Sequence, residues 1–200
     1  IIDAMKEKYN ITEVVDLSFH ENERSFLEGT GSMVFDHEHK IAYACLSART
    51  DKKLFLKTAS DIGYAPICFN AYDANGIAIY HTNVIMSIGA GFSVICLDSI
   101  SDKKEKALVE HSLKETEHEI INITFDQVNK FAGNMLALHN EKGEVFIIMS
   151  QNAHDSLNAN QKKRLSKYGE LLPLNINTIE TIGGGSVRCM IAEIFAEKKP

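Results

Sequence analysis

The sequence lacks the features of a protein that binds membranes or nucleic acids. No apolar run approaches the length of a bilayer-spanning segment, and the 21 Lys and Arg residues form no dense cluster. The formal net charge is −6, which disfavours a polyanionic partner. We therefore expect no membrane and no nucleic acid among its partners.

The four cysteines lie far apart and include no CxxC pair, so the spacing of a zinc finger is missing. Cys45, Cys68 and Cys96 lie in apolar runs, and we interpret them as small buried side chains in a reducing cytoplasm. Cys189 differs because a run of three glycines comes shortly before it. The composition, 44% hydrophobic and 24% charged, is that of one globular domain with a sizeable core.

A repeated pattern runs through the chain. Three segments, 32–47, 83–99 and 134–150, each contain an apolar strand, a polar turn and a second apolar strand. Each hairpin is followed by a helical pattern and then by another apolar strand. The predicted helices cover 50–63, 101–116 and 150–169, and the strands after them cover 65–71, 119–124 and 171–176. Two further strands are predicted over 13–18 and 190–195, and a helical stretch over 1–10.

The repeat has a nearly constant period. From Cys45 to Cys96 is 51 positions, and from Cys96 to Ile148 is 52. This period, with several strands and one helix in each unit, predicts a propeller-like or solenoid arrangement of α/β modules. Thr50 is the predicted N-cap of the first helix, and Gly63 its end.

Polar or glycine-rich junctions precede the hairpins: "LEGTG", "YHTN" and "FAGN", with a fourth, "GGGSVRC", near the end of the chain. Glu28, His81, Asn134 and Cys189 recur at these junctions with spacings of 53, 53 and 55. Around a pseudo-symmetry axis, equivalent positions come together, so these four residues would share one central pocket. The alternative is that the units form one mixed sheet and that the junction residues only make turns.

The junction residues have complementary chemistry. A cysteine thiolate is a strong nucleophile, a nearby histidine transfers protons, and a carboxylate orients the histidine or holds substrate N–H groups. Gly184 and Gly185, in the run that begins at Gly183, would let the backbone approach a substrate closely. Arg188 adjoins the thiol, but alternation along a strand would turn its side chain to the opposite face.

No metal or organic cofactor is expected. His37 and His39 in "DHEHK" are two apart and could suggest a metal, but we interpret this segment as a solvated hairpin turn. The "GGGS" run lacks the Lys and the following helix of a phosphate-binding loop. The remaining histidines outside the junctions are predicted to lie on the surface: His20, His111, His118, His139 and His154.

The motifs "LEGTGSMVFD", "YHTNVIMSIG", "FAGNMLAL" and "GGGSVRCM" resemble those of the pentein, or guanidine-modifying, superfamily. Among its members the chain most resembles the arginine-deiminase-related proteins, which include bacterial citrulline-utilisation hydrolases. The resemblance implies an α/β-propeller of five modules around a pseudo-fivefold axis. Five modules of this period need about 260 residues. We therefore expect residues 1–200 to be the C-terminal portion of a single catalytic domain, with an N-terminal part absent.

The resemblance also implies roles. Cys189 matches the nucleophile, His81 the general acid/base and Glu28 the first carboxylate of a Glu-Gly-Gly-Asp-like motif. Asn83, Gly184, Gly185, Asn134 and Arg188 are the candidate substrate-binding residues. Two positions depart from the guanidine-acting members, which typically have Asp at the place of Asn83 and often at that of Gly31. A buried guanidinium requires opposing carboxylates, whereas a neutral ureido group suits an amide.

The sequence thus predicts a cysteine-dependent hydrolase that converts citrulline to ornithine, ammonia and carbon dioxide. An amidinotransferase or an arginine deiminase on the same fold is the alternative, and a ribosome-binding factor is the non-enzymatic one. The partner is a small citrulline- or arginine-like molecule. Association with the missing N-terminal segment, or with further copies of the chain, is left open.

Overall fold

Three ββαβ units follow one another along the chain. The computed structural model describes residues 1–200. In each unit an antiparallel hairpin leads through a helical segment to a third strand, which runs parallel to the second. The units cover residues 34–69, 86–122 and 136–174. Each forms its own three-stranded sheet, so the predicted repeat is confirmed and the alternative of one mixed sheet is wrong.

The elements have the following bounds. The strands are β1 (Val34–Asp36), β2 (Ile41–Cys45), β3 (Ala65–Phe69), β4 (Met86–Gly89), β5 (Phe92–Ile95), β6 (Glu119–Asn122), β7 (Leu136–His139), β8 (Val145–Ser150) and β9 (Glu170–Leu174). The helices are α1 (Ile2–Lys8), α2 (Gly29–Ser32), α3 (Lys52–Asp61), α4 (Lys103–Glu115), α5 (Phe125–Val128), α6 (Gln151–Ser156), α7 (Ala159–Leu165) and α8 (Asn177–Gly183). Short 3-10 turns cover 18–23, 82–84, 97–99 and 187–190.

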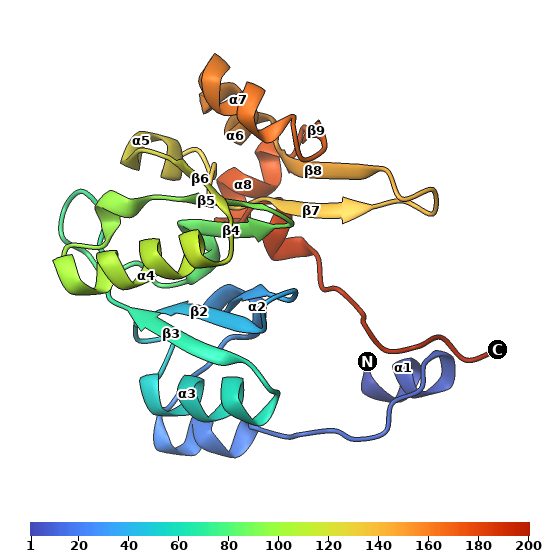
Figure 1. Cartoon of the computed structure of the whole chain (residues 1–200). Coiled ribbons are helices and arrows are strands. Elements are labelled where there is room, and N and C mark those ends of the chain that lie inside the picture. Colours follow the sequence, from blue (N-terminus) through green and yellow to red (C-terminus); the bar gives the residue numbers. More distant parts are fainter.

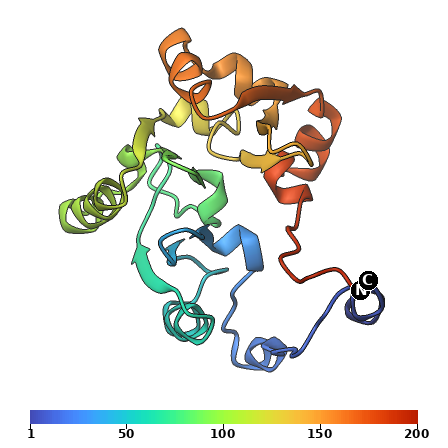
Figure 2. The ribbon, with the colours of Figure 1, turned by 45° about the vertical axis from the view of Figure 1, so that its right-hand side comes forward.

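The first strands of the units lie next to one another, β1 beside β4 and β4 beside β7. Figure 1 shows the units as three tiers, with α3, α4 and α7 away from this inner row of strands. Figure 2 shows the tiers around a common centre, with the two chain ends side by side. An isolated bridge between Tyr9 and Lys198 joins those ends. The α/β class is thus confirmed, with mixed three-stranded sheets and no closed barrel.

Side-chain caps determine where several helices begin. Asp51, not the predicted Thr50, caps α3 by accepting the N–H of Leu54, because the Thr50 backbone pairs with Ser47. The single helix predicted over 150–169 is wrong, since the chain is extended at Leu157, between α6 and α7. Asn158 forms a capping box with Gln161, and this new N-terminus satisfies the backbone donors that the break exposes.

The two outlying strands predicted from apolar runs are also wrong. Residues 11–17 have no regular structure, and Val15 is 67% exposed. Residues 191–196 form no strand either, and Phe195 is 70% exposed. Neither run meets a neighbouring strand edge, and a strand needs such a partner for its backbone groups. The helical stretch at the start of the chain is confirmed as α1.

The main hydrophobic cluster joins all three units. Its 24 buried residues include Tyr43 of the first, Ile95 of the second and Met149 of the third unit, so the units pack as one body. Polar contacts join them too. The pKa of Glu119 is lowered to about 2 by hydrogen bonds from Arg164 and Tyr168, which cross from the third unit to β6. No helix is both long and apolar enough to cross a membrane.

Candidate active site

Glu28 begins the short helix α2, and backbone contacts hold it in place. Its N–H donates to Ser32 Oγ at 2.9 Å, and that hydroxyl donates to the Arg49 carbonyl, also at 2.9 Å. The Glu28 carboxylate is 43% exposed, and Oε2 lies 3.5 Å from an Arg49 nitrogen. Glu28 is therefore a solvent-accessible acceptor on a fixed backbone.

His81 lies opposite Glu28, at the second junction. Its Nε2 is 2.8 Å from Glu28 Oε2. Because a carboxylate only accepts, Nε2 carries the proton and Nδ1 the lone pair when the ring is neutral. The neighbouring Thr82 is completely buried, and its hydroxyl donates to the Ser32 carbonyl and accepts the Cys45 N–H. Thr82 thus positions the His81 backbone, a role that no sequence pattern indicated.

Gly31 packs against the His81 ring. A Cβ at this position would lie 2.8 Å from both Cε1 and Nδ1 of His81. Real Cβ atoms essentially never approach so closely, and the ring would have to move. An Asp at this position would therefore collide with the His81 ring in its present place.

Cys189 lies in the 3-10 turn Val187–Met190, held by two amide side chains. Asn134 Nδ2 is 3.3 Å from the sulfur, and Asn83 Nδ2 is 3.8 Å from it. Asn134 also donates to the Asn83 carbonyl at 2.9 Å, and its Oδ1 accepts the Arg188 N–H at 3.0 Å. Asn134 therefore connects three junctions through one buried side chain.

Cys189 is the exposed cysteine of the four. Burial raises the pKa of the Cys45 thiol to about 12, and burial also raises the pKa of Cys68 and of Cys96. The sequence interpretation of Cys45 and Cys96 as buried side chains is confirmed, while Cys68 is half-buried.

The glycine run lies between α8 and the thiol. Gly184 ends α8 in the left-handed conformation, with φ of 69°. A Cβ on Gly185 would lie 3.3 Å from Cys189 Cβ and 3.5 Å from Sγ, so this glycine allows the close approach of the backbone. The buried Glu180 anchors the run by accepting a 2.6 Å hydrogen bond from Ser186. Sequence analysis missed Glu180, whose helical surroundings resemble those of any surface acid.

The Arg188 guanidinium contacts the segment that follows Cys189, not the thiol. It donates to the Ile191 carbonyl at 2.8 Å and pairs with Glu193 at 3.2 Å. The sequence predicted this orientation from the alternation of side chains along a strand. That reason is wrong, because residue 188 lies in a 3-10 turn and not in a strand. What Arg188 contributes next to the thiol is its backbone N–H, which donates to Asn134.

Tyr80 lies beside His81 and Arg49. Its ring is 5.0 Å from that of His81 and 5.2 Å from the Arg49 guanidinium. Burial raises the pKa of Tyr80, and the charge of Cys189 adds to this effect. A cavity of about 350 Å³ borders Tyr80 and Gly184, and its other walls come from the loop 73–79 and from α5. Tyr80 thus packs beside the His81 end of the Glu28–His81 pair and forms one wall of this cavity.

Asn83 has an acceptor without a partner. Its Nδ2 donates to the Thr30 carbonyl at 3.1 Å, which determines the orientation of the amide, and Oδ1 is then buried with no hydrogen bond. Asn83 also forms part of the wall of a mainly apolar cavity of about 560 Å³, between the inner strands and the tail 192–195. A buried acceptor of this kind favours a ligand that brings an N–H donor.

Comparisons with known proteins indicate the family of the chain. The family model described as "N,N dimethylarginine dimethylhydrolase, eukaryotic" matches residues 1–196. No curated protein sequence matches the chain. These findings confirm the resemblance to the arginine-modifying group of the pentein superfamily.

Solved structures share the fold at low sequence identity. The apo structure of ArgZ, an arginine dihydrolase of cyanobacteria, has a TM-score of 0.65 at 16% identity and covers 85% of this chain. The ternary complex of AgrE with ornithine and NAD⁺ has a TM-score of 0.65 at 15% identity and covers 86% of it. The shared part is 26% of the ArgZ chain and 24% of the AgrE chain.

Proposed function

This chain belongs to the eukaryotic N,N-dimethylarginine dimethylhydrolase family, and we propose that it is a cysteine-dependent hydrolase of guanidino C–N bonds. One observation carries the proposal. The Glu28–His81 pair and the Cys189–Asn134–Asn83 group lie in adjoining junctions, connected by the bond from Asn83 to the Thr30 carbonyl. A nucleophile, a proton carrier and an acceptor for substrate N–H groups are thus held together.

In the first half-reaction, the thiolate of Cys189 bonds to the central carbon of the guanidino group. His81, protonated and hydrogen-bonded to Glu28, gives its Nδ1 proton to the departing nitrogen as the C–N bond breaks. The amine leaves, and the remaining amidine carbon stays covalently attached to sulfur. The carboxylate of Glu28, 2.8 Å from Nε2, stabilises the imidazolium form that this step requires.

In the second half-reaction, His81 takes a proton from water through Nδ1 while the water oxygen bonds to the same carbon. The carbon–sulfur bond breaks, and the thiolate is regenerated. An arginine-type substrate therefore gives a ureido product and an amine. No metal ion or organic cofactor takes part in this scheme.

The acceptors of the site favour a substrate rich in N–H groups. Asn83 Oδ1 is buried without a partner, and Glu28 adds a carboxylate. A guanidinium of arginine or of a methylated arginine supplies donors to both. The aliphatic part of such a substrate would lie against Tyr80 and Gly184, which border the smaller cavity.

Citrulline is the second candidate, favoured by the neutral Asn83. A ureido –NH₂ can also donate to Asn83 Oδ1, and it carries no charge that calls for a second carboxylate. The same two half-reactions would then release one amine and a carbamate, and loss of carbon dioxide from the carbamate frees the second amine, so that the products are ornithine, ammonia and carbon dioxide. The Nδ2 donor of Asn83 faces the Thr30 carbonyl and Cys189 and not the open site. It therefore cannot donate a hydrogen bond to the ureido oxygen, and for this reason citrulline is the second candidate.

We also infer that residues 1–200 form one catalytic domain whose three units belong to a five-module propeller with a pseudo-fivefold axis. The inner row of β1, β4 and β7 and the adjoining chain ends support this arrangement.

The test is to incubate the full-length protein separately with dimethylarginine, arginine and citrulline, and to measure citrulline, ornithine and the released amines. Citrulline formed from dimethylarginine or arginine supports the first candidate, and ornithine formed from citrulline supports the second. Glycine or lysine added as co-substrate identifies a transferase by its amidino product. Absence of every product would contradict the proposal.

A further inference from the structure

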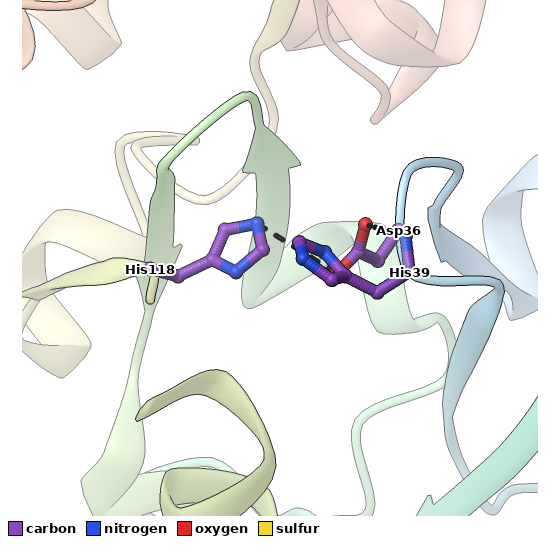
Figure 3. A group of neighbouring side chains, drawn as sticks. All are labelled: Asp36, His39 and His118. Atoms are coloured by element: carbon purple, nitrogen blue, oxygen red, sulfur yellow. Dashed lines mark hydrogen bonds and ion pairs between the residues drawn. The ribbon is translucent and has the colours of Figure 1, made fainter. Parts of the chain in front are cut away.

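A second polar cluster joins the first two units, away from the catalytic junctions. Asp36 ends β1, His39 lies in the β1–β2 turn, and His118 directly precedes β6. Figure 3 shows the three side chains converging between the two units. Asp36 and His118 are buried, whereas the His39 side chain is 36% exposed. The sequence prediction that His118 lies on the surface is therefore wrong, because its ring is buried in the interface between the two units.

The hydrogen-bond pattern leaves His118 Nε2 free. The Thr116 hydroxyl donates its one hydrogen to the carbonyls of Ser112 and Leu113, at 3.0 and 3.2 Å. At 2.8 Å from His118 Nδ1, the same oxygen therefore accepts the Nδ1–H. Nε2 makes no hydrogen bond, and it faces Asp36 Oδ2 across 3.8 Å, which is too far for one.

An unpartnered nitrogen that faces a buried carboxylate indicates a cation between them. The His118 side chain is 2% exposed, and so is that of Asp36. Two acceptors that face each other in this way repel, and His118 Nε2 has no hydrogen-bond partner. His39 Nδ1 is 2.9 Å from the same Asp36 oxygen, so a second imidazole is within reach.

The separations suit a small divalent ion. All the candidate ligand atoms lie within 4.8 Å of one another. In a tetrahedral zinc site, with ligand distances near 2.1 Å, neighbouring ligand atoms are about 3.4 Å apart. The observed 2.9 and 3.8 Å from Asp36 Oδ2 lie on either side of that value. The two imidazoles, whose ligand atoms lie within 4.8 Å of each other, would rotate toward the ion.

We propose that Asp36, His39 and His118 bind one divalent transition-metal ion, and that this ion is Zn²⁺. Two imidazoles and a carboxylate are a ligand set typical of zinc, with a fourth position open to water. Asp36 and His118 both border the 560 Å³ cavity, from which water can reach this position. The ion would cross-link the β1–β2 turn to the α4–β6 corner, and it has no part in the hydrolysis.

Surrounding contacts already orient the ligands. Thr116 holds the His118 ring with Nε2 toward the site. Asp36 Oδ1 accepts the backbone N–H of His39 at 3.0 Å, which leaves Oδ2 to the ion. Such outer contacts are typical of metal sites, where they fix the tautomer and orientation of each ligand.

The test measures Zn²⁺ binding to the Cys189→Ala protein after dialysis against a chelator, by calorimetry and by the absorption spectrum of bound Co²⁺. Removal of the Cys189 thiol excludes zinc bound at the catalytic site. We expect one equivalent of metal per chain and the visible bands of a tetrahedral Co²⁺ centre. A protein that binds no metal, or gives only the spectrum of hydrated Co²⁺, overturns the proposal.

Single-residue variants show whether the metal binds at this cluster. His39→Gln and His118→Gln should each weaken binding at least about tenfold, and Thr116→Val about 10- to 100-fold by removing the support of the His118 ring. His111→Gln is the matched control, since His111 is 73% exposed and outside the cluster. His39 is on the surface, so its variant keeps the fold even if that of His118 does not. Unchanged affinity in His39→Gln contradicts the assignment.

Discussion

Replacement of Asn134 by alanine should damage both stability and catalysis. The Asn134 side chain is 1% exposed and makes two strong contacts, to the Asn83 carbonyl at 2.9 Å and from the Arg188 N–H at 3.0 Å. In Asn134→Ala the buried Asn83 carbonyl and the half-buried Arg188 N–H both lose their partner. Each orphaned group costs about 1–3 kcal/mol, with the half-buried one at the lower end, so we expect the free energy of unfolding to fall by about 2–4 kcal/mol.

The catalytic loss has a separate cause. Without Asn134, the turn that carries Cys189 loses its connection to the Asn83 junction. A displacement of the nucleophile by about 1 Å lowers the rate about 100-fold, and we expect a fall of that size in kcat/KM. Asn134 acts as a positioning residue, so Asn134→Asp, which keeps the acceptor for Arg188 but loses the donor, should regain part of the stability and little of the rate.

The assay combines urea unfolding with steady-state kinetics on the best substrate. Asn160→Ala is the matched control, because Asn160 is exposed in α7, borders neither of the two cavities and makes no side-chain hydrogen bond. The control should behave as the wild type within about 0.5 kcal/mol. An Asn134→Ala protein with wild-type stability and kcat/KM would refute the reasoning about this side chain.

Three further predictions concern other parts of the structure. Gly31→Ala places a Cβ against the His81 ring, so kcat should fall about tenfold or more with the fold retained, and an unchanged kcat would contradict that packing. Iodoacetamide near pH 8 should label Cys189 well before the other three cysteines in peptide mass spectra; faster labelling of another cysteine would show that the assigned burial is wrong. Glu119 has its pKa lowered to about 2, chiefly by Arg164, so its stabilising effect is complete above its unfolded pKa of about 4.3 and is lost as the pH falls toward 2. Glu119→Gln should therefore cost about 1–2 kcal/mol in urea unfolding at pH 7 and less at pH 3, and equal costs at both pH values would contradict this.

The repeat was predictable because its signals are local. Each hairpin alternates between apolar strands and a polar turn, and capping residues precede each helix. Spacing alone then brought Glu28, His81, Asn134 and Cys189 to equivalent junctions, and the structure places these junctions side by side. Their catalytic roles stay a prediction until activity is measured.

The sequence-based predictions failed mainly where contacts between distant parts of the chain determine the structure. Residues 13–18 are apolar enough for a strand, but no strand edge lies beside them. The helix break at Leu157 depends on the capping box of Asn158, a local signal that the continuous apolar face concealed. His118 lies in a polar stretch and is nevertheless buried, because Asp36, 82 positions earlier, meets it across the joint between two units.

The most direct test of the account is to look for the covalent intermediate on Cys189. Wild-type protein and Cys189→Ala are mixed with dimethylarginine or arginine, quenched in acid during turnover, digested and examined by mass spectrometry. We predict that the Cys189 peptide of the wild type gains the mass of the substrate less the departing amine, and that Cys189→Ala shows neither adduct nor product. Product formation by Cys189→Ala at the wild-type rate would contradict the central claim.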